Sequence, residues 1–94
     1  MKVVFKILDK SGSPRKCIVE FADTIKYEEE HNVSFDAMRQ NPKIRDLAWL
    51  CWRSETRRKE TALAFEDWCD RVDAIDLMTE EDKIVPLESA QVTG

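Results

Sequence analysis

Histidine, glycine and proline are scarce in this chain of 94 residues, which has one His, two Gly and three Pro. A single histidine excludes a zinc site built on two histidines. So few glycines and prolines argue against collagen-like, low-complexity and turn-rich β architectures. The length allows one domain. Because 43% of the residues are hydrophobic and 36% are charged, we expect a small core and a well-solvated surface.

The chain also lacks an excess of basic residues and any long apolar run. It has 15 Lys and Arg against 19 Asp and Glu, a net charge of −4, and non-specific nucleic-acid binding needs concentrated positive charge. The longest apolar run, 47–52, is far shorter than the roughly 20 residues of a membrane helix. Charges at Lys2, Lys6 and Asp9 interrupt the start of the chain, where a signal peptide needs an apolar core. We therefore expect an intracellular protein without a membrane partner, and we regard nucleic acid as a poor candidate.

No motif of a known enzyme class is present. Three widely spaced cysteines, Cys17, Cys51 and Cys69, exclude a closed disulfide framework, and we expect reduced thiols packed like small apolar side chains. His31 with Cys17 or Cys51 is the candidate Cys–His pair, but a position near a helix end favours a structural role for this histidine. The chain has no GxSxG, glycine-rich phosphate loop or HExxH. We predict no enzyme activity, no metal and no cofactor.

Two strands are predicted at the N-terminus, over 2–8 and 15–21. Apolar and polar residues alternate in both, and the turn-forming residues 9–14 separate them. A two-stranded ribbon is marginal in water, so this hairpin needs a helix on one face or a further strand at its edge.

Helical periodicity begins after the hairpin. A first helix is predicted to start at Asp23 or Thr24 and to stop at Asn32, which tolerates a left-handed backbone. Ser34 is predicted to cap a short helical turn that ends at Asn41.

The hydrophobic centre of the chain is a predicted helix over about 42–58. Its apolar stripe includes Leu47 and Cys51, and Trp49 and Trp52 widen it to nearly the whole circumference. Such a helix lies centrally in the core or reserves a second face for a partner.

A last helix is predicted over about 63–77, with Phe65, Trp68, Val72 and Ile75 on one stripe. Beyond Met78 the periodicity fades. We therefore predict a single domain over residues 1–78 and a mobile tail over 79–94. The predicted fold class is α+β, with the N-terminal hairpin packed on three to four helices and a mostly helical composition.

Candidate binding residues come from three groups. A domain of this size cannot easily bury three indoles, so we expect one of Trp49, Trp52 and Trp68 to be exposed or in an interface. The basic residues near position 55 are helix-end charges, partners of the acidic last helix or a patch for nucleic acid; these are Arg53, Arg57, Arg58 and Lys59. Arg53, Arg57 and Arg58 are the candidate polar contacts to a partner.

Acidic residues form the third group, on the predicted last helix. Spacings of three predict one face for Asp67, Asp70 and Asp73. A di-metal bundle would need further Glu and His on facing helices. A solvated face, self-association and docking of a basic partner therefore stay open.

The order of these weak signals resembles one protein family. A strand pair leads into FADTIKYEEEHNVSF at 21–35, then RDLAWLCW at 45–52 and FEDWCDRVDAI at 65–75. Over residues 1–78 this pattern resembles the tail assembly chaperones of long-tailed bacteriophages. Many members have glycine where this chain has Asn32.

The resemblance implies a non-enzymatic protein of the host cytoplasm. Such a chaperone binds the tape measure protein, keeps it soluble, helps recruit tail tube subunits and is not part of the mature virion. The family lends no residue-level binding motif. The alternative hypothesis is a small phage-encoded adaptor or regulator that binds a host protein or nucleic acid.

Overall fold

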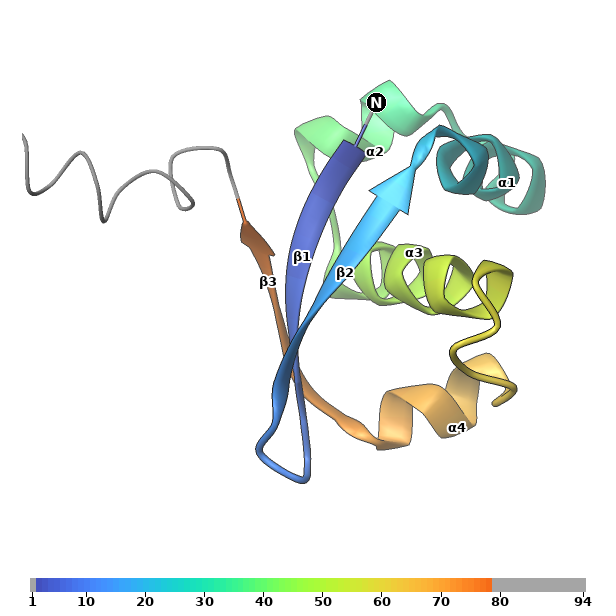
Figure 1. The fold of residues 1–94 in the computed structure, drawn as a ribbon. Coiled ribbons are helices and arrows are strands. Elements are labelled where there is room, and N and C mark those ends of the chain that lie inside the picture. Colours follow the sequence, from blue (N-terminus) through green and yellow to red (C-terminus); the bar gives the residue numbers. More distant parts are fainter. Residues whose placement is uncertain (1, 79–94) are drawn as a thin grey trace, which may run out of the picture.

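The computed structural model describes residues 2–78. Its elements, in chain order, are β1 (Lys2–Asp9), β2 (Pro14–Glu20), α1 (Phe21–His31), α2 (Phe35–Gln40), α3 (Ile44–Arg57), α4 (Phe65–Asp70) and β3 (Val72–Met78) (Figure 1). About half of the described residues are helical, and the predicted α+β class is confirmed. The predicted mobile tail, 79–94, lies outside the described residues.

The strands form one antiparallel sheet in the order β2-β1-β3, so β1 is the central strand. The predicted hairpin is confirmed, with Val3 opposite Val19. Its loop turns at Gly12, whose φ of 90° suits glycine, and the Gly12 amide donates to the Asp9 carbonyl at 2.9 Å.

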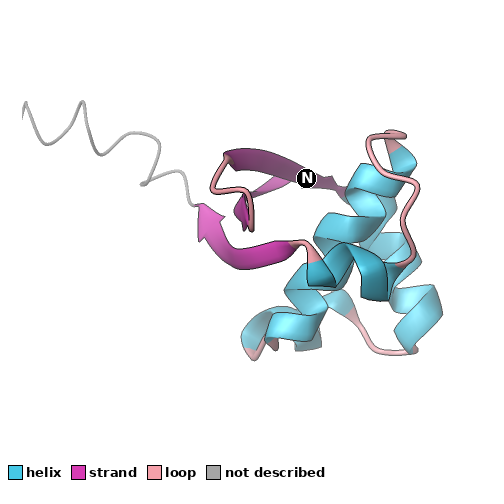
Figure 2. Ribbon diagram, turned by 90° about the horizontal axis from the view of Figure 1, so that it is seen from below, coloured by secondary structure: helices cyan, strands magenta, loops and turns pink. Residues whose placement is uncertain are grey.

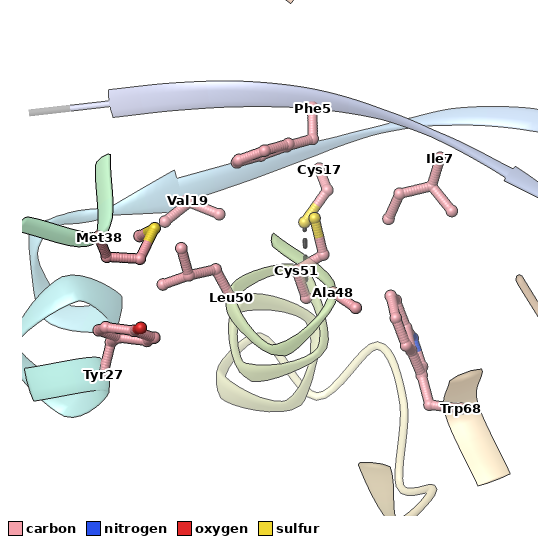
Figure 3. Close-up of a cluster of buried hydrophobic side chains, with 10 residues drawn as sticks. All are labelled: Phe5, Ile7, Cys17, Val19, Tyr27, Met38, Ala48, Leu50, Cys51 and Trp68. Carbon is pink, nitrogen blue, oxygen red and sulfur yellow. Dashed lines mark hydrogen bonds between the residues drawn. The ribbon is translucent and has the colours of Figure 1, made fainter. Parts of the chain in front are cut away.

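All the helices lie on one side of the sheet (Figure 2). Alternate residues of β1 and β2 point towards them, and α3 packs against β2. In Figure 3, Phe5 and Ile7 of β1 face Leu50 and Cys51 of α3 across the core, and all four side chains are buried. The opposite face of the sheet carries exposed lysines, which are Lys2, Lys6 and Lys16. The core therefore lies in a single layer between sheet and helices.

The first two helices have the ends that local sequence predicts. Asn32 has a φ of 54° and ends α1, and the Ser34 side chain accepts from the Ala37 amide at 3.1 Å and caps α2. However, α1 begins at Phe21, two residues before Asp23. Asp23 is therefore the third residue of the helix and not its cap.

The predicted helix over 63–77 is correct only in its first half. α4 ends at Asp70, and Val72–Met78 forms strand β3 on the second edge of β1. A third strand satisfies the backbone groups of β1 that the hairpin leaves unpaired. The register shifts between Leu8 and Asp9, so Asp73 has no opposite residue on β1. This bulge explains why Val72 and Ile75, three residues apart, both pack on the core.

Candidate functional site

None of the three tryptophans is exposed. Trp68 is 2% exposed and fills the core below the sheet, whereas Trp49 and Trp52 on α3 are half-buried. The small domain thus accommodates all three indoles, because two of them lie along the helix surface and not in the centre. Whether these two contact a partner stays a prediction.

Trp49 and Trp52 belong to a row of five aromatic rings, which we call the aromatic row. It runs from α1 across α3 to α4 and consists of Tyr27, His31, Trp49, Trp52 and Phe65. Successive ring centroids are 4.3, 4.9, 5.9 and 5.6 Å apart. The first pair is stacked and the others meet edge to face, both of which are favourable ring geometries. Only Tyr27 is buried, so the other four rings line a half-exposed surface.

Hydrogen bonds hold the row in place. The Trp52 Nε1–H donates to the Leu63 carbonyl at 2.9 Å, and the Tyr27 hydroxyl donates to Asp46 at 2.9 Å. His31 Nδ1 lies 3.0 Å from the Tyr27 carbonyl. Burial, followed by the hydrogen bond to Asp46, raises the pKa of Tyr27 to about 12. The protein thus satisfies the Tyr27 hydroxyl and the Trp52 indole N–H, and Trp49, Trp52 and Phe65 are partly buried against the core.

Two of the predicted polar contacts are engaged inside the domain. Arg57 donates from Nε and Nη2 to the two carboxylate oxygens of Asp23, at 2.8 and 2.9 Å, and Asp23 is completely buried. This hydrogen-bonded pair raises the pKa of Arg57. Arg58 donates to the Ile18 carbonyl. Arg53 is half-buried one residue after Trp52. Arg57 and Arg58 are therefore engaged inside the domain, whereas Lys59 is exposed.

A second buried acid, Glu55, connects three elements. Its carboxylate accepts from Arg15 Nε at 2.7 Å, from Arg15 Nη2 at 3.2 Å and from the Trp68 indole at 2.9 Å. The hydrogen bond with Glu55 raises the pKa of Arg15. The burial and the ion pairs of Asp23 and Glu55 were not predicted from the sequence. The one available signal was that Glu55 continues the apolar stripe of Ala48 and Cys51.

The predicted acidic helix face does not extend beyond Asp70. Asp67 and Asp70 are exposed on α4, but Asp73 is exposed on β3, where residues alternate between faces. The reason is the early end of the helix at Asp70.

The cysteines and the histidine do not form the candidate catalytic pair. Cys17 and Cys51 lie in the core, where the Cys17 thiol donates to the Cys51 carbonyl at 3.5 Å (Figure 3), and all three cysteines are free. The hydrogen bond with the Cys17 thiol, followed by burial, raises the pKa of Cys51, which disfavours the thiolate. His31 stacks on Tyr27 in the aromatic row.

Within residues 2–78, no group of three or more Asp, Glu, His or Cys side chains has the arrangement of a metal site. Across the same residues, no helix combines the length and apolar character needed to cross a membrane.

No protein-family model matches this chain, and comparisons with curated proteins and with solved structures found no significant match.

Proposed function

We propose that this protein is a tail assembly chaperone of a long-tailed bacteriophage, which binds apolar helical segments of the tape measure protein through its aromatic row. The observation that carries the proposal is the row itself, in which four half-exposed rings from three helices line one surface. Tryptophan and other aromatic side chains are enriched among residues that dominate binding energy. The similarity of residues 1–78 to the family supplies the identity of the partner.

The form of the row and the net charge of the chain suit this role. An amphipathic helix presents an apolar stripe, and a row of rings offers it a matching strip. The net charge of −4 opposes aggregation of the complex. The chaperone then holds the tape measure protein in solution in the host cytoplasm, helps recruit tail tube subunits and leaves before the virion is complete.

Co-expression with a helical fragment of the tape measure protein from the same phage tests the proposal. We expect the fragment to become soluble with the chaperone and to stay insoluble alone. Trp49→Ser should remove most of this effect, because it deletes the middle of the row. A fragment that stays equally insoluble with and without the wild-type chain would overturn the proposal.

A control variant separates loss of binding from loss of fold. Ile25→Ser changes an exposed apolar residue of α1 that is 41% exposed and outside the row. We expect this variant to solubilise the fragment as wild type does, and circular dichroism should show that both variants are folded. If folded Trp49→Ser is as active as Ile25→Ser, the row is not the binding surface.

The alternative, an adaptor that binds a host protein or nucleic acid, predicts a different salt response. Nucleic-acid binding weakens steeply with salt, whereas burial of an apolar helix does not. The internal contacts of Arg57 and Arg58 leave less of the basic group available to phosphates, which favours a protein partner.

A further inference from the structure

A second apolar surface lies between the start of α3, the end of α4 and β3. It is a groove of about 350 Å³, whose walls include Ile44, Ala48, Cys69, Val72 and Ile75. Ile44 is 69% exposed, the highest value among the large apolar residues in the described part of the chain. An apolar side chain in contact with water beside an open apolar groove indicates a surface that another molecule covers.

The groove lies along a free strand edge. β3 pairs with β1 on one side, and no other described strand pairs with its second side. An outer strand presents unpaired N–H and C=O groups that another chain can use by adding a strand. Groove and edge together therefore offer side-chain and main-chain contacts to an extended segment.

The rim of this surface is acidic. Exposed carboxylates follow one another along α4 and the start of β3, and these are Glu66, Asp67, Asp70 and Asp73. Asp76 pairs with Lys6 of β1 and lies on the opposite face of the sheet. Asp73 itself lines the groove. Burial and the nearby Asp70 raise the pKa of the Cys69 thiol, while Arg45 acts in the opposite direction. With Arg71, this makes two basic residues against four acidic ones.

We propose that the groove and the free edge of β3 bind an extended, basic segment of a partner protein, which adds as a strand beside β3. One of its apolar side chains enters the groove against Ile44 and Ile75. Its lysines or arginines on the groove side lie beside Asp70 and Asp73. This site uses different side chains from the aromatic row and does not depend on the proposed function.

Charge complementarity favours a basic partner segment over two other candidates for the groove and the β3 edge. A second copy pairing β3 with β3 would bring two acidic rims together, and like charges across an interface are unfavourable. Residues 79–94 contain four acidic residues and one lysine, so they too would be repelled. The acids that protect the edge against pairing between copies attract a basic strand.

A synthetic peptide with the repeat Lys-Thr-Val-Thr, which places lysine and valine on the same face of a strand, tests the proposal on the full chain, with glutamate in place of lysine as the matched control. Fluorescence anisotropy should show binding of the basic peptide alone. We expect Asp70→Asn with Asp73→Asn to weaken binding about tenfold, because two opposite charges are lost. Ile44→Ser should weaken it by about the same factor, because the apolar contact is lost.

Two substitutions on α1 provide controls. Glu29→Gln and Ile25→Ser alter an exposed acid and an exposed apolar residue of another surface, and each should leave the affinity within about twofold. Equal affinity for the acidic peptide, or equal losses in the α1 variants, would overturn the proposal.

Amide hydrogen exchange of the free protein distinguishes the rival occupants. We expect the amides on the free edge of β3 to exchange fast and to become protected when the basic peptide binds. Slow exchange without peptide at every protein concentration would mean that residues 79–94 cover the edge. Protection that increases with protein concentration would mean a second copy, and either result overturns the proposal.

Discussion

Two buried carboxylates connect elements that are far apart in the sequence. Asp23 in α1 binds Arg57 at the end of α3, and Glu55 in α3 binds Arg15 on β2. Removing a charge from water is unfavourable unless an opposite charge and further hydrogen bonds compensate. Both acids meet this condition, since each also accepts an N–H from another residue. We infer that the two pairs specify how α3 sits on the sheet and beside α1.

Replacement of Asp23 by alanine tests the first pair. The variant leaves the Arg57 guanidinium without its carboxylate partner, so we expect the free energy of unfolding to fall by about 3 kcal/mol. Urea denaturation measures the change. The control is Asp36→Ala, which removes an exposed pair with Arg39 and should cost less than about 1 kcal/mol. Equal losses in the two variants would contradict the structural role of Asp23.

The single tyrosine reports on the buried end of the aromatic row. In the folded protein the pKa of Tyr27 is about 12, against about 10 for an exposed tyrosine. The folded state thus holds the phenol proton more tightly than the unfolded chain. The corresponding stability is complete below about pH 10 and is lost as the pH rises towards about 12.

Ultraviolet titration of tyrosinate measures this directly, because no other tyrosine contributes. We expect a midpoint near pH 12 in native buffer and near about pH 10 in concentrated urea. Tyr27→Phe should make stability less sensitive to alkali, since it removes the titrating group. A native midpoint near that of the urea sample would contradict the burial of this hydroxyl.

The elements that short-range sequence patterns specify were predictable from the sequence. Turn formers between two alternating segments predicted the hairpin, and apolar spacings of three and four predicted α3. β3 was not predictable in this way. Val72 and Ile75 fit a helical stripe as well as a bulged strand, and the pairing with β1 that decides between them involves residues about 70 positions away.

The aromatic row was predictable only in part. Trp49 and Trp52 are three apart on one helix, so sequence alone places them side by side. Tyr27 and His31 join them because α1 packs on α3, a contact that no local pattern reveals. The ion pair between Arg57 and Asp23 could not be predicted for the same reason, because it too depends on the packing of α1 on α3.

The cap of α2 gives a test at the level of one helix. Ser34 accepts from the Ala37 amide, and alanine at this position would leave that N–H without its side-chain acceptor. We expect Ser34→Ala to lower the free energy of unfolding by about 1 kcal/mol in thermal or urea denaturation. Ser13→Ala, in the exposed hairpin loop, is the control and should change it by less than about 0.5 kcal/mol. An equal effect of the two would show that the cap contributes nothing.

At the scale of the molecule, the sheet joins the two ends of the described chain. β1 and β3 are its first and last elements, and they pair along most of their length. Without β3, one edge of β1 would be unpaired and the core would lose contacts from Val72 and Ile75. Strand β3 is therefore part of the domain and not an appendage.

Two shortened chains test this, together with the predicted domain boundary at residue 78. A chain that ends at Arg71 should show no cooperative thermal transition, because its sheet has two strands only. A chain that ends at Met78 should melt within about 5 °C of the full chain, a shift that corresponds to roughly 1 kcal/mol. Cooperative melting of the shorter chain at the temperature of the full chain would contradict the role of β3.

The central position of β1 also affects how the protein folds during translation. The ribosome releases β1 first and β3 last among the described elements, so the sheet and the core are completed only after every helix has emerged. Until then the nascent chain carries β1 with one edge unpaired, open to strands of other nascent chains. Pairings this distant in sequence also slow folding. The last residues of the domain thus control when the newly made protein leaves its aggregation-prone stage.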